Sequence, residues 1–203
     1  MKLPLIGICR HRLTTDGTGV TTLVAFHGCP LRCRYCLNSQ CLRPEGVWRQ
    51  LEVGELLQEV MLDDLYFQAT GGGICFGGGE PLLRSEAIAE FCRQCPAEWN
   101  IYVETSLNVP LPSLQQVIPY VAHYYIDVKD LSPDVYRRYC QQDNAQVVDN
   151  LRYLALQGLQ HKVTVRLPLI PGFNTPADRQ RSRQQLESLG FTAFDEFVYL
   201  LNR

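Results

Sequence analysis

The chain has 203 residues, 46% hydrophobic and 20% charged, a composition that suits one globular domain with its own core. Its net charge of −2 offers no basic surface of the kind that binds nucleic acid or an anionic membrane. No apolar run approaches the roughly 20 residues of a membrane span. Basic residues follow the apolar start, residues 1–9, rather than precede it, so we expect a cytoplasmic protein without an export signal.

Short β-rich runs alternate with helical patterns along the chain. In chain order, the pattern first predicts a strand over 22–27, a helix over 53–65, a strand over 74–76, a helix over 85–95, a strand over 101–104 and a helix over 114–120. It then predicts a strand over 124–128, helices over 133–139 and 147–156, a strand over 162–167, a helix over 176–189 and a strand over 194–200. Ser132 and Pro133 suit a helix start, and Gly158 and Gly190 suit helix ends. The alternation predicts an α/β fold with a parallel sheet, formed by residues 1–203 as one domain.

Chemically active residues stand where the predicted strands end. They are Cys29 after the first strand, 77–80 after the second, Glu104 and Thr105 after the third, Asp127 and Lys129 at the fourth, and Arg166 near the end of the fifth. The carboxyl ends of parallel strands lie at one edge of a sheet, where α/β folds carry their sites. We therefore expect these residues to meet at one site.

Nine cysteines in a chain without an export signal favour metal or redox chemistry over a disulfide scaffold. Only Cys29, Cys33 and Cys36 form a tight group, and three thiolates at this spacing are able to converge from one loop. Three ligands on a [4Fe–4S] cube leave one iron open to a further ligand. A zinc site completed by Cys41 or His27 is an alternative, and so are free packed thiols.

The motif Cys-x3-Cys-x2-Cys, with Tyr35 just before its last cysteine, resembles the signature of the radical S-adenosylmethionine (SAM) superfamily. Residues 16–19, 76–81, 125–129 and 166–174 are similar, in the same order, to motifs of glycyl-radical-enzyme activating enzymes, typified by pyruvate formate-lyase activating enzyme. Thr18 stands where that group usually has proline. The resemblance covers the chain from Asp16 to about Asn174.

This resemblance implies a partial (β/α)6 TIM-like barrel of radical SAM type. It also implies one [4Fe–4S] cluster on Cys29, Cys33 and Cys36, whose open iron binds SAM for reductive cleavage to a 5′-deoxyadenosyl radical. Only Cys41 and Cys75 lie between the triad and the glycine motif, which is too few for further clusters.

The cofactor contacts are likewise implied by the resemblance, and no residue is assigned as a catalytic acid or base. They are Tyr35 beside the adenine, Gly78, Gly79 and Glu80 near the methionine amino group, Glu104 and Thr105 near a monovalent cation, Asp127 and Lys129 facing the cation and cofactor, and Arg166 at the cofactor carboxylate.

Each of these positions also has a structural interpretation. The 77–80 stretch suits a tight strand-to-helix loop, Tyr35 a packed aromatic residue, and Glu104 a solvated or ribose-binding carboxylate. Asp127 and Lys129 suit a structural pair and Arg166 a surface residue. Cys92 and Cys95 fall in a helix pattern away from the site, and Cys9, Cys75 and Cys140 are expected to be buried as small apolar residues.

The predicted function is an anaerobic oxidoreductase that installs a glycyl radical on a partner enzyme and takes its electron from a donor such as flavodoxin or ferredoxin. A radical SAM enzyme that modifies a small molecule or a peptide is the first alternative. A non-catalytic iron–sulfur or zinc protein is the second. Activating enzymes usually continue beyond the last predicted strand with a histidine and a closing helix, so we expect a more open site or one that a partner covers.

Overall fold

The computed structural model describes residues 2–13 and 15–199, so the last residue of the predicted strand 194–200 lies outside the described part. One eight-stranded sheet runs through the molecule in the order β3-β1-β2-β4-β5-β6-β7-β8. Six neighbouring strands are parallel: β2 (Thr21–Phe26), β4 (Gly73–Gly78), β5 (Asn100–Thr105), β6 (His123–Asp127), β7 (Val163–Leu169) and β8 (Ala193–Val198). They coincide with the six predicted strands, shifted by a residue or two at their ends.

Two further strands extend the sheet and were not predicted. Strand β1 (Leu3–Arg12) is antiparallel to β2, and β3 (Arg49–Leu51) is antiparallel to β1. Leu3 and Leu5 are fully buried on β1, but Pro4 and a register shift after Leu5 interrupt the alternation that would mark a strand. The three residues of β3 show no strand pattern in the sequence. They form a strand only because they pair with β1.

The helices connect successive strands. They are α1 (Val53–Met61), α2 (Asp64–Thr70), α3 (Ser85–Gln94), α4 (Leu111–Val117), α5 (Pro133–Cys140), α6 (Ala145–Leu156) and α7 (Pro176–Ser188), with 3₁₀ turns η1 (Ser39–Leu42), η2 (Pro44–Gly46), η3 (Pro81–Arg84) and η4 (Gln160–Lys162). All predicted helices are present except that the one over 53–65 is divided into α1 and α2.

The division of that helix has a tertiary cause. Asp63, at the junction of α1 and α2, is 2% exposed and points into the sheet rather than along a helix surface. Its Oδ2 accepts hydrogen bonds from Arg10 Nη1 at 2.6 Å and from Thr22 Oγ1 at 2.7 Å. These partners lie on β1 and β2, so the local apolar spacing gave no sign of the break.

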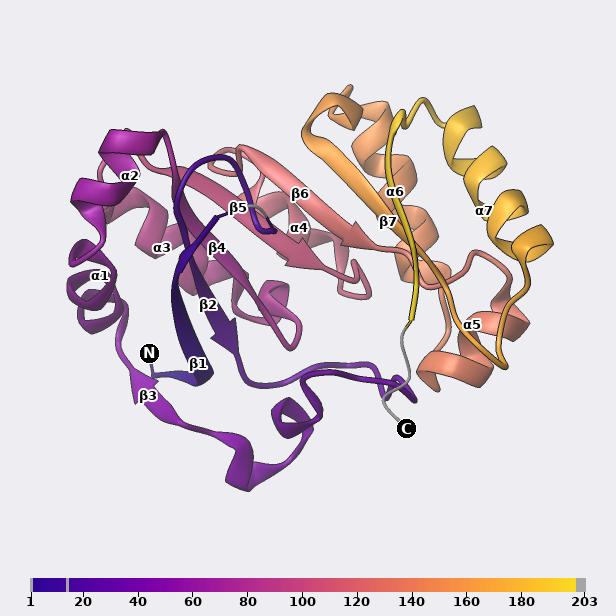
Figure 1. The fold of residues 1–203 in the computed structure, drawn as a ribbon, viewed down its shortest axis with the longest axis horizontal. Helices are drawn as coiled ribbons and strands as arrows, with labels where there is room; N and C mark the ends of the chain where they lie inside the picture. Colours follow the sequence, from indigo (N-terminus) through magenta and orange to yellow (C-terminus); the bar gives the residue numbers. More distant parts are fainter. Residues whose placement is uncertain (1, 14, 200–203) are drawn as a thin grey trace.

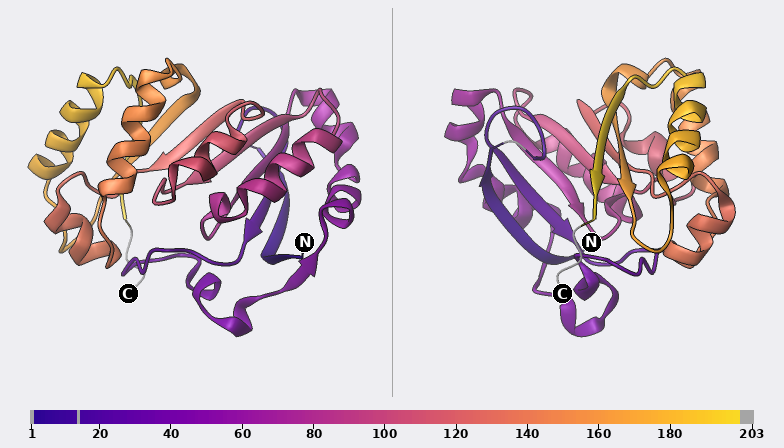
Figure 2. Two further views of the ribbon diagram at one scale, coloured as in Figure 1. Left: turned by 180° about the vertical axis from the view of Figure 1, so that it is seen from behind. Right: turned by 45° about the vertical axis from the view of Figure 1, so that its right-hand side comes forward.

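The helices cover the outer face of a curved sheet that does not close into a full barrel (Figure 1). Seen from behind, they lie in front of the strands, and the two ends of the sheet stay apart (Figure 2). Aromatic rings pack between sheet and helices: Phe76 lies 5.9 Å from Phe26 and 5.4 Å from Phe91, measured between ring centroids. The architecture is the predicted partial TIM-like barrel.

Within the described residues, no helix has both the length and the apolar character that crossing a membrane requires.

Candidate active site

A cavity of about 580 Å³ opens at the carboxyl ends of the parallel strands. The predicted site residues that line it are Cys29, Cys33, Cys36, Tyr35, Gly78, Gly79, Glu104, Thr105, Asp127, Lys129 and Arg166. Glu80 lies behind this wall and is 1% exposed. Residues that were chosen from strand ends separated by up to 137 positions therefore meet around one space, as the parallel topology requires.

The loop that carries the three cysteines is fastened at both of its sides. Backbone N–H groups of Arg32 and Arg34 donate to the carbonyls of Cys140 (2.9 Å) and Tyr139 (3.2 Å) at the end of α5. On the other side, Asn38 Nδ2 donates to the carbonyl of Gly78 at 2.9 Å. The loop thus spans the cavity between α5 and the end of β4.

The thiols of this loop differ in acidity. A hydrogen bond with Cys140 lowers the pKa of Cys33, and their Sγ atoms lie 3.9 Å apart. A hydrogen bond from Cys41 lowers the pKa of Cys36 to about 6. Burial, followed by the charge of Glu80, raises the pKa of Cys29 to about 12. Both downward shifts act in favour of the thiolate, the form that binds metals.

The three cysteines of this loop are a donor set that fits an iron–sulfur cluster. Within residues 2–13 and 15–199, no three His, Cys, Asp or Glu side chains converge closely enough to hold one metal ion. Cys29, Cys33 and Cys36 instead stand around one cavity, within electrostatic range of one another. Three thiols around one cavity supply the three ligands that leave one iron of a [4Fe–4S] cube open.

The glycines after β4 are fixed by close packing. Gly78 has a φ of +93°, and a Cβ there would lie 2.7 Å from the Cα of Ala25. A Cβ on Gly79 would lie 2.2 Å from the carbonyl oxygen of Gly28. Side chains are excluded from this turn, so bare backbone borders the cavity beside the cysteine loop.

Glu80 holds this turn to the loop after β5. Its Oε1 accepts from Thr105 Oγ1 (2.6 Å) and from the N–H of Leu82 (3.2 Å). Its Oε2 accepts from Ser106 Oγ (2.6 Å) and from the N–H of Ser106 (2.9 Å). Burial raises the pKa of Glu80, against these hydrogen bonds. The residue acts on the site through the turns it connects.

Glu104 and Arg166 form an ion pair across β5, β6 and β7, with 2.8 Å between Oε1 and Nη1. Arg166 also donates to the carbonyl of Thr15 at 2.9 Å and lies over the ring of Tyr125, 4.8 Å from its centroid. Burial raises the pKa of Glu104, and the charge of Arg166 opposes that shift. Burial would lower the pKa of Arg166, but Glu104 and Asp127 raise it, so the guanidinium stays charged.

Lys129 and Asp127 form a second pair, with 3.1 Å between Nζ and Oδ2. Lys129 Nζ also donates to the hydroxyl of Tyr199 at 2.9 Å. Burial would lower the pKa of Lys129, but Asp127, Tyr199 and Cys33 raise it well above its ordinary value. The buried ammonium is therefore kept charged beside the cysteine loop.

Tyr35 packs among other aromatic rings at the rim of the cavity. Its ring centroid lies 5.6 Å from that of Phe173 and 6.0 Å from that of Tyr139, and its hydroxyl donates to the carbonyl of Pro171 at 3.3 Å. The ring borders the cavity and is also part of a structural cluster, so both interpretations of Tyr35 have support.

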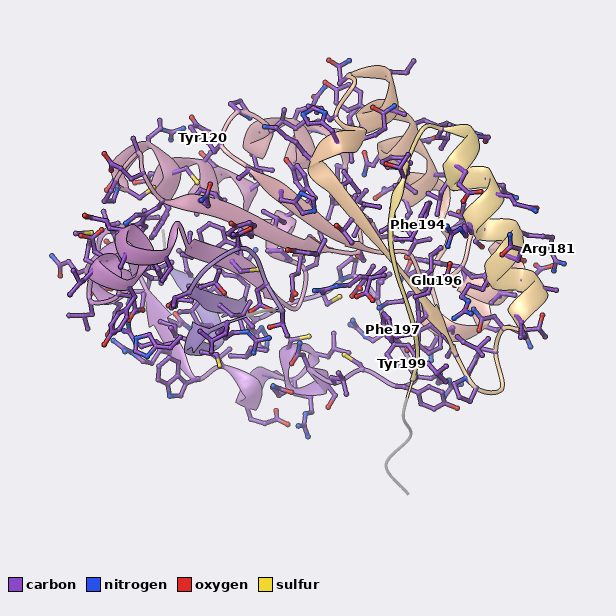
Figure 3. All side chains as sticks on the ribbon, turned by 45° about the horizontal axis from the view of Figure 1, so that its top comes forward. Tyr120, Arg181, Phe194, Glu196, Phe197 and Tyr199 are labelled. Atoms are coloured by element: carbon purple, nitrogen blue, oxygen red, sulfur yellow. The ribbon has the colours of Figure 1, made fainter. Side chains whose placement is uncertain are left out.

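Several supporting residues were not assigned to the site from the sequence. Asn38, Ser106, Cys140 and Tyr199 hold predicted site residues through the contacts described above. Tyr199 lies one residue past the end of β8, close to Phe197, and Figure 3 labels both. Asn38 and Ser106 stand close in sequence to predicted residues, which was a usable signal, whereas Cys140 and Tyr199 had none.

One expectation about the remaining cysteines was wrong. Cys75 and Cys140 are buried as predicted, but Cys9 is exposed. It lies on β1, whose side chains beyond Leu5 alternate toward solvent, and its sulfur accepts a 3.8 Å hydrogen bond from Arg12.

Comparison with known proteins gives a consistent result. A family model described as the radical SAM superfamily matches residues 23–180. The chain is 31% identical to the (2S)-3-sulfopropanediol dehydratase activating enzyme of Klebsiella oxytoca, over 78% of this chain and 69% of that protein. It is 30% identical to the pyruvate formate-lyase 2-activating enzyme of Escherichia coli (strain K12), over 91% of this chain and 72% of that protein.

Solved structures support the fold. SuiB of Streptococcus suis superposes with a TM-score of 0.66 at 13% identity, over 87% of this chain and 38% of that one. The enzyme anSMEcpe with bound AdoMet superposes with a TM-score of 0.61 at 15% identity, over 85% of this chain and 49% of that one. At such identities the likeness concerns the architecture alone.

Proposed function

Because the chain belongs to the radical SAM superfamily, we propose that Cys29, Cys33 and Cys36 hold one [4Fe–4S] cluster and that the adjoining cavity binds SAM. The observation that carries this proposal is that three thiols, a side-chain-free glycine turn and two partly buried ion pairs border the same space. When bound, the cluster supplies one electron to the sulfonium of SAM, which is cleaved to methionine and a 5′-deoxyadenosyl radical.

The charges around the cavity complement those of SAM, which carries an ammonium, a carboxylate and a sulfonium. Arg166 and Lys129 offer positive groups to the carboxylate. Glu104 and Asp127 offer negative groups to the ammonium or the sulfonium. Gly78 and Gly79 let the backbone approach the methionine part closely, and Glu80 and Thr105 keep that turn in position. Tyr35 borders the space proposed for the adenine.

We propose a glycyl-radical enzyme as the protein substrate. Both relatives named above are activating enzymes by their names, and each is matched over more than two thirds of its length. The proposal includes an electron donor such as flavodoxin or ferredoxin, a cytoplasmic location, and one radical SAM domain formed by residues 1–203. Hydrogen abstraction from a glycine of the partner would then transfer the radical to that protein.

A monovalent cation beside Glu104, which the proposal includes, would share this carboxylate with Arg166. Arg166 already lies 2.8 Å from Glu104 Oε1 and supplies a positive charge there. A cation would have to use the remaining oxygens of Glu104 together with Asp127. Activity that rises with added potassium or sodium would support the cation, whereas equal activity in a buffer without either ion would speak for the guanidinium alone.

Anaerobic reconstitution with iron and sulfide tests the central claim. We expect the absorption and electron paramagnetic resonance of a [4Fe–4S] cluster, a spectral change on adding SAM, and 5′-deoxyadenosine that depends on dithionite. Cys33→Ala should lose all three, and Cys92→Ala on α3 is the matched control that should keep them. Tightly bound zinc with no SAM binding would overturn the proposal.

The partner is tested separately. The reduced, SAM-loaded protein is mixed with a candidate glycyl-radical enzyme, and an organic radical signal on that enzyme, lost when its glycine is replaced by alanine, is the expected result. SAM cleavage with no protein radical on any candidate, together with consumption of a small molecule or peptide, would refute the activating role while leaving the SAM chemistry standing.

A further inference from the structure

Cys140 lies beside a proposed cluster ligand although it is far away in sequence. It is the last residue of α5 and is fully buried, and its Sγ lies 3.9 Å from the Sγ of Cys33. Cys33 is half-buried and borders the cavity. One member of the pair is therefore open to small molecules, while the other is shielded.

The backbone holds these two sulfurs together. The N–H of Arg32 donates to the carbonyl of Cys140, and the N–H of Arg34 donates to the carbonyl of Tyr139. These bonds are made by the residues before and after Cys33, so the segment that carries Cys33 is clamped to the segment that ends in Cys140. A disulfide needs about 2.05 Å between its sulfurs. The two sulfurs would have to approach from 3.9 Å to this bond length.

We propose that Cys33 and Cys140 form a reversible disulfide when the protein without its cluster meets a peroxide, with Cys33 as the attacked thiol and Cys140 as the resolving thiol. The importance of Cys33 rests on the proposed function, because it is a cluster ligand only there. The cross-link itself depends on the two thiols alone.

The chemistry balances with the peroxide as oxidant. The sulfur of Cys33 attacks one peroxide oxygen, an S–O bond forms, the O–O bond breaks, and one water leaves after taking the thiol proton. The sulfur of Cys140 then attacks the sulfenic sulfur of Cys33, the S–S bond forms, the S–O bond breaks, and a second water leaves with the proton of Cys140. Two thiols lose two electrons in total, and hydrogen peroxide is reduced to two waters.

The cross-link would preserve the site. A sulfenic acid that meets no second thiol is oxidised further to sulfinic acid, which thiols do not reduce. When Cys140 attacks the sulfenic acid, oxidation of Cys33 stops at the disulfide. A dithiol reduces this disulfide back to two thiols. The Cys33 thiol would then return and be available for a new cluster.

Peptide mapping tests the inference on the full chain after the cluster has been removed with a chelator. The protein is treated with hydrogen peroxide, its free thiols are alkylated, and the digest is analysed by mass spectrometry with and without dithiothreitol. We expect a peptide pair joined through Cys33 and Cys140 that dithiothreitol separates. Cys140→Ala should lose the recoverable Cys33 thiol and accumulate sulfinic acid there, while Cys92→Ala should behave as the unaltered protein.

The result that would overturn the inference is a digest without this pair, including one in which Cys36 and Cys41 are joined instead. Recovery of Cys33 in Cys140→Ala equal to that in the unaltered protein would overturn it as well. The mapping of the unaltered protein needs no variant, so poor folding of Cys140→Ala would not decide the matter. Cluster assembly and SAM cleavage are measured on separate samples, so failure of either proposal is distinguishable from failure of the other.

Discussion

Replacing Glu80 with glutamine should weaken the fold at the site by an amount that the hydrogen bonds predict. A glutamine oxygen in the place of Oε1 still accepts from Thr105 and Leu82. The amide nitrogen of the glutamine then takes the place of Oε2. The Ser106 hydroxyl is able to rotate and accept a hydrogen bond from this nitrogen, but the Ser106 N–H loses its acceptor. An unsatisfied buried N–H costs about 1–3 kcal/mol. The relief from burying a carboxylate offsets part of this cost.

We therefore expect Glu80→Gln to lower the free energy of unfolding by about 2 kcal/mol, and the midpoint of thermal unfolding by about 4–8 °C. Urea unfolding followed by circular dichroism measures this on cluster-free protein. Glu98→Gln is the control, because Glu98 is exposed and should change stability by less than about 0.5 kcal/mol. If Glu80→Gln is as stable as Glu98→Gln, the hydrogen bond from the Ser106 N–H to Glu80 does not stabilise the turn and the reasoning fails.

Three further predictions follow from other contacts of the site. Asn38→Ala removes the bond from Asn38 to the Gly78 carbonyl and should cost about 1 kcal/mol in urea unfolding, whereas an unchanged midpoint would mean that the cysteine loop docks without it. Asp127→Asn leaves the buried Lys129 ammonium without its counter-charge and should lower the free energy of unfolding by about 1–2 kcal/mol. The loss is no larger because Asp127 is itself partly exposed. Equal stability of the variant would contradict the pairing. Burial raises the pKa of Glu104 in the folded protein, so the free energy of unfolding should fall as pH rises from about 4.5, the usual value, through the raised value. Glu104→Gln should flatten that slope, and a slope that persists unchanged in urea titrations would contradict it.

The sequence by itself determined most of the sheet and the composition of the site. The six parallel strands each have an apolar or β-branched run of their own, and each of the first five is followed by a helix pattern. Since parallel strands present their carboxyl ends at one edge, the residues after those runs were expected to meet, and all but Gly77 and Glu80 border the cavity. The spacing of Cys29, Cys33 and Cys36 is also visible in the sequence, because the three cysteines lie close together in the chain.

The tertiary structure alone decided which residues support that site. Strand β3 exists through its pairing with β1, and the break between α1 and α2 exists through Asp63 and its partners on β1 and β2. Glu80 joins the turn at the end of β4 to the loop after β5. Cys140 lies next to Cys33, although 107 positions separate them in the sequence. Periodicity and motif spacing report contacts within a few residues of one another. These contacts join segments that are distant in sequence, and they are fixed only when the sheet and its helices have packed.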